Sequence, residues 1–407
     1  MANNSSLGAA KGAKNDEFYT QYNDIEAEMN AYYEYDHDVF RGKTVLCPCD
    51  DPEWSNFTKY FAANFKRFGL KKLISTSYAK SAGSRQLTLF ESSSPLYDED
   101  KHDTHGKLFT LTGDTDGSGR VDTDDVKFSG YLDGDGDFRS KEVTKLRDEA
   151  DIIITNPPFS LFREFLAWIL EAGKQFVIIG SKNAITYKEV FPLLKENKIW
   201  LGPEFPGGNA YFRIAEDAIR DFASGVFDSS TGLVKFRNVG WFTNIDHGLR
   251  HQPLLLDTME HNLKFNKKLR RKFEKDYGKI EYPHYDNYDA IEVPFVEAIP
   301  SDYDGVMGVP VTFMDKYNPE QFEIIGLLQS STDEQAGIPN LRYYDDFKEM
   351  RQDMSYTGAS GKKANGNPVV AGKSAKGNFL YCESTNEYVH SVYARIVIRL
   401  KKGGNAQ

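Results

Sequence analysis

The sequence predicts an α/β fold in which helices cover a largely parallel sheet. Between residues 41 and 198, short apolar runs alternate with helical patterns, and this spacing of strand, helix and strand is typical of parallel-sheet units. Residues 151–155 hold a continuous apolar run, as expected for a strand that is buried on both faces. A sizeable core is possible, because 40% of the 407 residues are hydrophobic.

The elements of this sheet can be placed one by one. Apolar runs typical of strands occupy residues 44–49, 72–77, 151–155, 175–180 and 198–201. Helical patterns lie at residues 52–68, 161–171 and 187–196. For the first of these helices, Asp51 is the expected N-cap, Pro52 suits the first helical position, and Gly69 suits the C-terminal end.

An insertion is predicted over residues 79–132, where the alternation is interrupted. Within it, residues 107–112 and 126–132 predict a hairpin around an acidic loop. The loop follows the spacing of calcium-binding loops, with candidate ligands Asp114, Asp116, Ser118, Asp122 and Asp125. However, its twelfth position is Asp rather than Glu, and strands rather than helices flank it. A solvent-exposed turn without a metal is therefore favoured, and calcium is the alternative.

The pattern changes beyond about residue 205, and a domain boundary is expected near residue 250. Residues 233–242 predict one or two strands, and a basic helix follows within residues 264–279. Residues 356–378 are rich in Gly, Lys, Asn and Ser and predict a loop, and residues 388–400 predict a closing strand.

Composition argues against several classes of protein. No apolar run of about eighteen residues occurs, and residues 1–14 are small and polar, so we expect a disordered lead-in, no membrane-spanning helix and no signal peptide. The three cysteines, Cys47, Cys49 and Cys382, are too few for a disulfide framework or a four-ligand zinc site, and they fit a cytoplasmic protein. The net charge of −10 argues only weakly against nucleic acid, because binding requires only a local basic surface.

The most informative motif is Thr155-Asn156-Pro157-Pro158-Phe159, directly after the central apolar strand. The side-chain oxygen of Asn156 and the carbonyl of Pro157 can both accept hydrogen bonds from an exocyclic amine, in a turn that the two prolines make rigid. Such bonds localise the nitrogen lone pair for attack on a sulfonium methyl group. Phe159 offers a flat face to a base that has been extruded from the duplex. The motif lies where open α/β sheets bind ligands, although a plain loop is the alternative.

Together with this motif, further segments resemble the EcoRI-type adenine-specific DNA methyltransferase family. The segments are residues 15–21 (NDEFYTQ), 45–57 (VLCPCDDPEWSNF), 134–140 (GDGDFRS), 155–162 (TNPPFSLF), 241–244, 304–326 and 393–399. They span most of the chain in family order. The resemblance implies a Rossmann-like S-adenosylmethionine-dependent methyltransferase sheet within residues 15–250 and a C-terminal target-recognition region at residues 251–407.

The resemblance also implies roles for individual residues. Asn156, Pro157, Pro158 and Phe159 match the catalytic and target-base motif. The cofactor residues that it implies are Asp50 and Asp51 at the amino-acid end, Asn15, Phe18 and Thr20 near the methionine moiety, and Asp135 or Asp137 at the adenine or ribose. The chain departs from the usual pattern in two places: residues 47–52 replace a Gly-rich loop, and residues 75–78 lack the ribose-binding carboxylate.

Basic residues of the C-terminal region are the candidate contacts to DNA phosphates, although those on the helix would equally suit a solvated face. They are Lys267, Lys268, Arg270, Arg271, Lys362, Lys363, Lys373 and Lys376. The partner expected from the family is double-stranded DNA, without a membrane; a cognate restriction endonuclease would act separately, and the enzyme would be a monomer.

The expected function is site-specific transfer of methyl from S-adenosylmethionine to N6 of a flipped adenine, in a restriction-modification system or as an orphan modification enzyme. Cytosine N4 methylation uses nearly the same chemistry and is one alternative. A catalytically silent DNA- or calcium-binding protein on the same fold is another. The dipeptide Pro48-Cys49 resembles the nucleophile of cytosine-C5 methyltransferases, but it follows the first strand, so a buried, inert thiol is expected.

Overall fold

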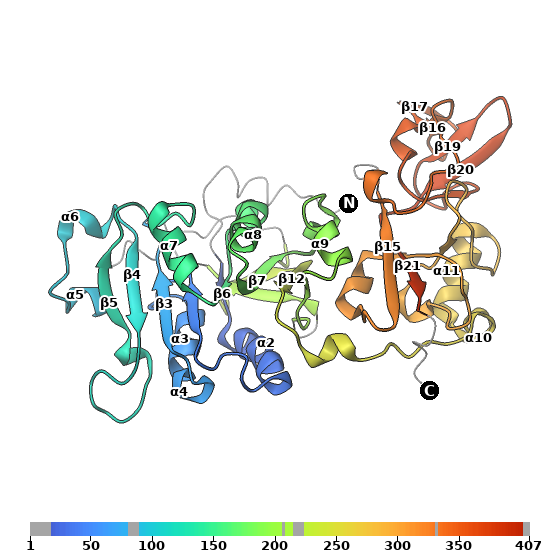
Figure 1. The fold of residues 1–407 in the computed structure, drawn as a ribbon. Coiled ribbons are helices and arrows are strands. Elements are labelled where there is room, and N and C mark those ends of the chain that lie inside the picture. The colour runs from blue at the N-terminus through green and yellow to red at the C-terminus, as the bar shows by residue number, and fades with distance from the viewer. Residues whose placement is uncertain (1–17, 80–88, 206–207, 215–223, 330–332, 402–407) are drawn as a thin grey trace. The chain divides into compact units, whose positions relative to one another are not determined.

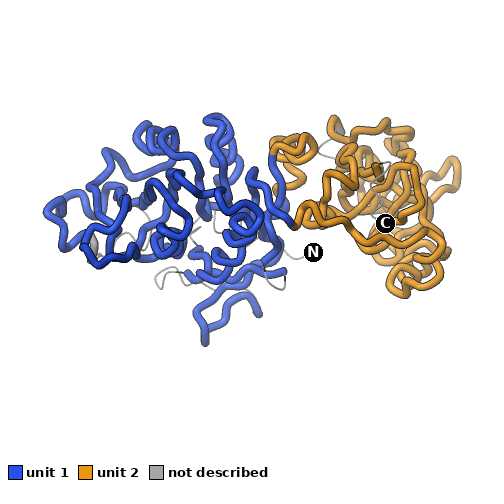
Figure 2. The backbone as a smooth tube through the Cα atoms, turned by 60° about the horizontal axis from the view of Figure 1, so that its bottom comes forward, with its two compact units in different colours: residues 1–183, 199–248 blue, residues 184–198, 249–407 orange. Residues whose placement is uncertain are grey.

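The chain forms two compact units. The computed structural model describes residues 18–79, 89–205, 208–214, 224–329 and 333–401. The first unit comprises residues 1–183 and 199–248, and the second comprises residues 184–198 and 249–407 (Figure 2). Among the described residues, no helix combines the length and the apolar character that crossing a membrane requires.

An eight-stranded mixed sheet forms the centre of the first unit (Figure 1). In spatial order, its strands are β5 (Lys127–Tyr131), β4 (Lys107–Leu111), β3 (Lys72–Thr76), β2 (Thr44–Cys47), β6 (Ile152–Thr155), β7 (Gln175–Ser181), β12 (Val239–Thr243) and β8 (Trp200–Leu201). Strands β3, β2, β6 and β7 are parallel neighbours, as their apolar runs predict. The predicted hairpin is confirmed as β4 and β5, and β4 extends the sheet antiparallel to β3.

Helices cover both faces of this sheet. They are α2 (Tyr22–Tyr35), α3 (Asn56–Ala63), α4 (Phe65–Phe68), α7 (Lys141–Glu149) and α8 (Phe162–Glu171), and the hairpin excursion adds α5 (Leu89–Ser92) and α6 (Glu99–His102). Figure 1 shows α7 and α8 on one side of the sheet and α2, α3 and α4 on the other. Because both faces are covered, every residue of β2 and of β6 is buried.

The helix that we expected over residues 52–68 begins later, so the prediction of Asp51 as its N-cap was wrong. The carbonyl of Asp51 accepts hydrogen bonds from the N–H groups of Trp54 and Ser55, at 3.1 and 2.7 Å, which closes a separate turn. Ser55 is the N-cap, and its side chain accepts from the N–H of Phe57 at 3.1 Å. The C-terminal end is as expected, because Gly69 follows α4 with φ +63°.

A small antiparallel sheet lies beside the Asn-Pro-Pro-Phe motif. Its order is β1 (Tyr19–Thr20), β9 (Ala210–Arg213), β11 (Leu233–Phe236) and β10 (Phe227–Asp228). Rings from three of its segments, Phe18, Phe212 and Phe236, pack on one another with centroids 4.7 to 6.0 Å apart. This cluster joins the small sheet to the core of the first unit.

The second unit contains two further sheets and three helices. One sheet has the order β13 (Ile291–Glu292), β14 (Met307–Pro310), β21 (Arg395–Leu400) and β15 (Phe322–Leu328), and the other has β17 (Tyr356–Ser360), β16 (Lys348–Met350), β19 (Phe379–Cys382), β20 (Glu387–Ser391) and β18 (Val369–Ala371). The helices are α9 (Phe191–Lys195), α10 (Met259–Phe265) and α11 (Lys267–Tyr277). Among the described residues, short 3₁₀ helices include η2 (Thr123–Asp125), η3 (Phe159–Leu161), η4 (Lys182–Thr186), η7 (Gly248–His251), η8 (Val296–Ala298), η9 (Val311–Lys316), η10 (Asp333–Gln335) and η11 (Gly361–Ala364).

Three expectations for the later chain were wrong in detail. The predicted loop at residues 356–378 contains β17, η11 and β18, since neighbouring strands supply hydrogen bonds that composition does not reveal. The single strand expected over residues 388–400 is two strands, β20 and β21, that belong to different sheets. The helix expected over residues 187–196 is shorter, and its segment belongs to the second unit.

Packing of α8 on β7 yields a testable prediction. A Cβ added at Gly180 would lie 2.3 Å from Cε2 of Phe162, so we expect Gly180→Ala to lower the free energy of unfolding by about 1–3 kcal/mol. Gly134→Ala is the control, because no atom lies within 4 Å of its added Cβ. Urea unfolding measures both; equal stability of the two variants would contradict this packing.

Candidate active site

The carboxyl ends of β2 and β6 lie side by side at a topological switch point. From β2 the chain passes to β3 on one side, whereas β6 pairs with the other side of β2. Open sheets leave a ligand-binding crevice at such a point. The hydroxyl of Thr155 donates to the carbonyl of Pro48 at 2.8 Å and so ties the two loops together. The crevice is therefore flanked by residues 48–55 and by the Asn-Pro-Pro-Phe motif.

Asn156 is held with its side-chain oxygen unused. Its Nδ2 donates to the carbonyl of Phe18 at 2.6 Å, and its Oδ1 is buried and has no hydrogen-bond partner among the described residues. The carbonyl of Pro158 accepts from Leu161 at 2.9 Å, whereas that of Pro157 receives no hydrogen bond in the described part of the chain. Two acceptors, one from Asn156 and one from Pro157, are thus available to a ligand.

The ring of Phe159 takes part in packing. It stacks on Phe18 with centroids 5.9 Å apart and an interplanar angle of 29°, and it meets Phe212 and Phe236 edge to face. The ring is only partly buried. Phe18, which we expected near the cofactor, contributes its ring to this cluster and its carbonyl to Asn156. The aromatic cluster therefore fixes the position of the Asn-Pro-Pro-Phe motif.

The two adjacent aspartates after β2 have different surroundings. Asp50 holds the loop, because its Oδ1 accepts from the hydroxyl of Ser55 at 2.7 Å and its N–H donates to the carbonyl of Thr76 at 2.6 Å. In Asp51, Oδ1 accepts from the N–H of Glu53 at 3.0 Å, while Oδ2 is buried without a partner in the described chain. Burial raises the pKa of Asp51 to about 6. Asp51 thus has a carboxylate oxygen left for a ligand.

The loop at residues 133–140 packs against the end of β3. The carbonyl of Asp135 accepts from the N–H of Ala79 at 2.8 Å. Gly136, at φ +85°, lies so close that a Cβ there would be 2.3 Å from the carbonyl oxygen of Ser77. Asp135 therefore lies beside the strand end that lacks its own carboxylate. Asp137 instead binds Arg139 through both carboxylate oxygens.

The segment that precedes α2 is attached to the crevice. The carbonyl of Thr20 accepts from Nδ2 of Asn56 at 2.7 Å, and the hydroxyl of Thr20 is buried without a partner among the described residues. Asn15, which the resemblance also placed near the methionine moiety, lies outside the described residues.

A buried charge pair at the edge of the site was not predicted. Nζ of Lys107 lies 2.6 Å from Oε2 of Glu91, and both side chains are fully buried. His102 and Tyr131 hydrogen-bond to the other oxygen of Glu91. The positive charge of Lys107 lowers the pKa of Asp51, although burial of Asp51 outweighs it. A lysine at a strand start gives no sequence signal of burial, so sequence reasoning missed this group.

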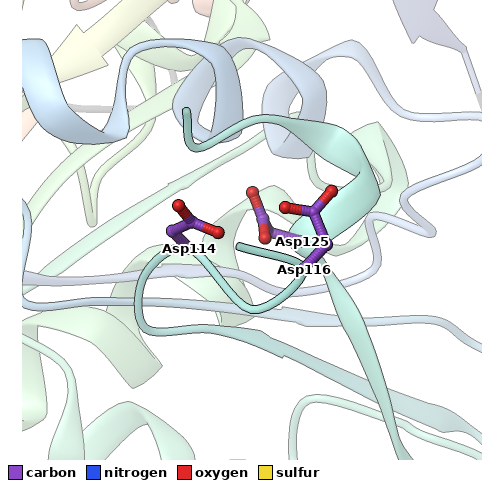
Figure 3. A group of neighbouring side chains, drawn as sticks. All are labelled: Asp114, Asp116 and Asp125. Carbon is purple, nitrogen blue, oxygen red and sulfur yellow. The ribbon is translucent and has the colours of Figure 1, made fainter. Parts of the chain in front are cut away.

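The acidic hairpin loop brings three carboxylates together. Ligand atoms of Asp114, Asp116 and Asp125 all lie within 4.8 Å of one another (Figure 3). Backbone N–H groups already bind them, as Thr115 does to Asp125 at 2.6 Å. Of the other two candidate ligands, Ser118 donates its N–H to Asp116 at 2.8 Å, and Asp122 caps η2. Turn hydrogen bonds account for this arrangement without a metal.

The candidate DNA-binding residues of the second unit fall into two groups. Lys268 pairs with Glu297 at 2.6 Å, Arg270 donates to carbonyls at the end of α10, and Lys373 lies over the ring of Tyr388 at 4.3 Å. The remaining cations are exposed and make no ion pair with the described residues; they are Lys267, Arg271, Lys362, Lys363 and Lys376. The second group is better suited to contact phosphates.

A mixed sheet with unused acceptors at its switch point and an Asn-Pro-Pro-Phe turn after β6 is the arrangement expected of a methyltransferase that acts on an amine. Comparison with known proteins identifies the family of methyltransferases to which the chain belongs. The chain belongs to the EcoRI family of adenine-specific methyltransferases, whose model, described as "Adenine-specific methyltransferase EcoRI", matches residues 6–401. It is accordingly an adenine-specific methyltransferase.

Three relatives illustrate this membership. The chain is 43% identical over 326 residues to the type II methyltransferase M.EcoRI of Escherichia coli, a match covering 80% of this chain and 89% of that one. It is 34% identical over 321 residues to the type II methyltransferase M.MpnI of Mycoplasma pneumoniae, with 78% and 84% covered. It is 33% identical over 321 residues to M.MgeORF184P of Mycoplasma genitalium, with 78% and 85% covered. No solved structure gives a significant match.

The buried pair at the site's edge can be tested by stability. Lys107→Met leaves the carboxylate of Glu91 buried without its cation, and we expect it to lower the free energy of unfolding by about 3 kcal/mol or more. Adding Glu91→Gln removes that uncompensated charge, so the double variant should recover most of the loss in urea unfolding. A double variant no more stable than Lys107→Met would show that the charge is not the cause.

Proposed function

We propose that this methyltransferase transfers the methyl group of S-adenosylmethionine to N6 of an adenine extruded from duplex DNA at one recurring sequence. Asn156 carries the proposal. Its amide is oriented by the carbonyl of Phe18, so that Oδ1, buried and without a partner in the described chain, is presented at the switch point. An unsatisfied buried acceptor costs about 1–3 kcal/mol, and such a cost is typical of a site that a ligand completes.

The chain's own residues would prepare the amine for attack. Oδ1 of Asn156 and the carbonyl of Pro157 accept the two N6 hydrogens, which localises the nitrogen lone pair and directs it out of the base plane. Packing of Phe159 against Phe18 keeps these acceptors in place. When bound, S-adenosylmethionine supplies an electrophilic methyl group on its sulfonium sulfur. A strong general base is not required.

The sheet is proposed to be the Rossmann-like cofactor sheet of methyltransferases. Its order supports this assignment, because four central parallel strands place the switch point between β2 and β6. The free Oδ2 of Asp51 suits the ammonium group of the cofactor, and Thr20 lies near the same end. Asp135, beside the end of β3, is the better candidate for the ribose, since Asp137 is bound to Arg139.

The second unit is proposed to recognise the DNA sequence. Its exposed cations without ion pairs, such as Lys362 and Lys363 on η11, support this role. The relatives named type II methyltransferases favour a restriction-modification system, in which a separate nuclease would act on the same sequence. A monomeric enzyme is consistent with this arrangement.

The first experiment is incubation of the purified protein with tritiated S-adenosylmethionine and diverse duplex DNA. Nucleoside analysis should find the label in N6-methyladenine, and modification-sensitive sequencing should find it at one recurring sequence. For Asn156→Ala, we expect turnover to fall by about 10²-fold or more, with cofactor affinity kept. Asn64→Ala, a change outside the site, is the control. Normal turnover of Asn156→Ala would contradict the assignment of Asn156 as an acceptor for the N6 amine.

The raised pKa of Asp51 predicts how cofactor affinity depends on pH. Burial raises this pKa to about 6, with small contributions from Glu53 and Glu91, while Lys107 opposes the shift. The carboxyl is therefore neutral below about pH 6 and cannot pair with an ammonium group. Titration calorimetry with S-adenosylhomocysteine should show affinity falling by up to tenfold per pH unit below 6. Asp51→Asn should bind weakly with no such dependence; an unchanged pH profile would refute the pairing.

Phosphate contacts predict a change in salt dependence. Lys362→Ala with Lys363→Ala should weaken DNA binding and reduce the slope of log affinity against log salt by about one to two, because each contact contributes about 0.9. Lys268→Ala is the matched control, since Glu297 already engages its ammonium group. An unchanged slope in the double variant would place η11 outside the DNA interface.

A further inference from the structure

In the turn between β2 and α3, Oδ2 of Asp51 is not alone in lacking a hydrogen-bond partner among the described residues. Buried atoms without a hydrogen-bond partner among the described residues include Oδ2 of Asp51, Oε2 of Glu53 and Nε1 of Trp54. The N–H of Trp54 donates to the carbonyl of Asp51 at 3.1 Å, which closes the turn.

Neighbouring segments are bound to this turn. Asn56 connects the turn to Thr20, whose hydroxyl is also buried without a partner in the described chain. Nζ of Lys59 donates to the main-chain carbonyl of Glu53 at 2.6 Å. The pKa of Lys59 is lowered by burial, and the charges of Glu53 and Asp51 act on it in the opposite direction. The two carboxylates therefore lie close enough to act on the same lysine, and Trp54 follows Glu53 directly in the chain.

The chemistry of these atoms is that of a receptor for an α-amino acid. Ionised Asp51 and Glu53 can only accept hydrogen bonds, so they fit an ammonium group and repel a carboxylate. The indole N–H of Trp54 can only donate, so it fits a carboxylate and cannot bind an ammonium group. A zwitterion presents both groups on one carbon atom. Leaving several polar atoms buried without partners is costly, and a bound zwitterion would satisfy them.

We propose that Glu53 and Trp54 bind the α-amino-acid end of the cofactor, with the Trp54 indole N–H donating to its carboxylate and Glu53 joining Asp51 around its ammonium group. This inference rests on the proposed use of S-adenosylmethionine. It explains how the chain dispenses with the Gly-rich loop: side chains of the turn at residues 51–54 would make contacts that a loop backbone makes in other methyltransferases.

Titration calorimetry on the full chain with three ligands tests the role of Trp54 at the carboxylate separately from the role of Glu53 at the ammonium group. S-adenosylhomocysteine carries both groups, its decarboxylated analogue keeps only the ammonium group, and 5′-methylthioadenosine lacks the whole amino-acid end. Trp54→Phe should weaken binding of S-adenosylhomocysteine by about tenfold or more and leave the other two ligands unaffected. Glu53→Gln should weaken the first two ligands and leave 5′-methylthioadenosine unaffected.

Trp168→Phe is the matched control, because its indole N–H donates to the hydroxyl of Thr144 at 3.2 Å, away from the turn. It should bind all three ligands as the unmodified protein does. Trp54→Phe that weakens all three ligands equally would show a merely structural tryptophan, and one that weakens none would also overturn the proposal. Failure of the unmodified protein to bind S-adenosylhomocysteine would instead refute the proposed use of the cofactor.

Discussion

The pairing of β2 with β6 is the constraint on which the rest of the site depends. Val45 pairs with Ile152 and Leu46 with Ile153, across more than a hundred residues of sequence. The two strands end together, so the loop that carries Asp51 and the loop that carries Asn156 emerge side by side. The bond from Thr155 to Pro48 holds the loops at that distance. With a different register between β2 and β6, the two loops would not lie next to each other.

The site is held by its surroundings rather than by its own contacts. Polar atoms of Thr20, Asp51 and Asn156 are buried without partners in the described chain, which costs stability where they lie. Rigid neighbours offset that cost: the rings around Phe159 on one side and the bonds of Asp50 to the end of β3 on the other. The arrangement is typical of functional sites, where some buried polar atoms lack hydrogen bonds and the surrounding core maintains the geometry.

Signals that are local in the sequence predicted the central strands and the turn that follows β6. The apolar run at residues 151–155 predicts a strand that is buried on both faces. The residue types of Asn156 and the two prolines are enough to predict hydrogen-bond acceptors in a rigid turn. The predictions that failed concerned features that depend on contacts with residues distant in the sequence. Asp51 has the composition of a helix cap, but its carbonyl closes a turn instead. Lys107 and Glu91 are polar residues that only the fold brings together and buries. The excursion of residues 184–198 into the second unit left no mark in local composition.

The hydrogen bond from Asn156 to Phe18 has a consequence for biosynthesis. Phe18 leaves the ribosome early, yet β1 beside it is paired only by β9, at residues 210–213. More than half of the chain must therefore be synthesised before this strand pairing, which helps to place the carbonyl that orients the Asn156 amide, can form. A nascent chain that ends before β9 holds the Asn-Pro-Pro-Phe motif but lacks that pairing.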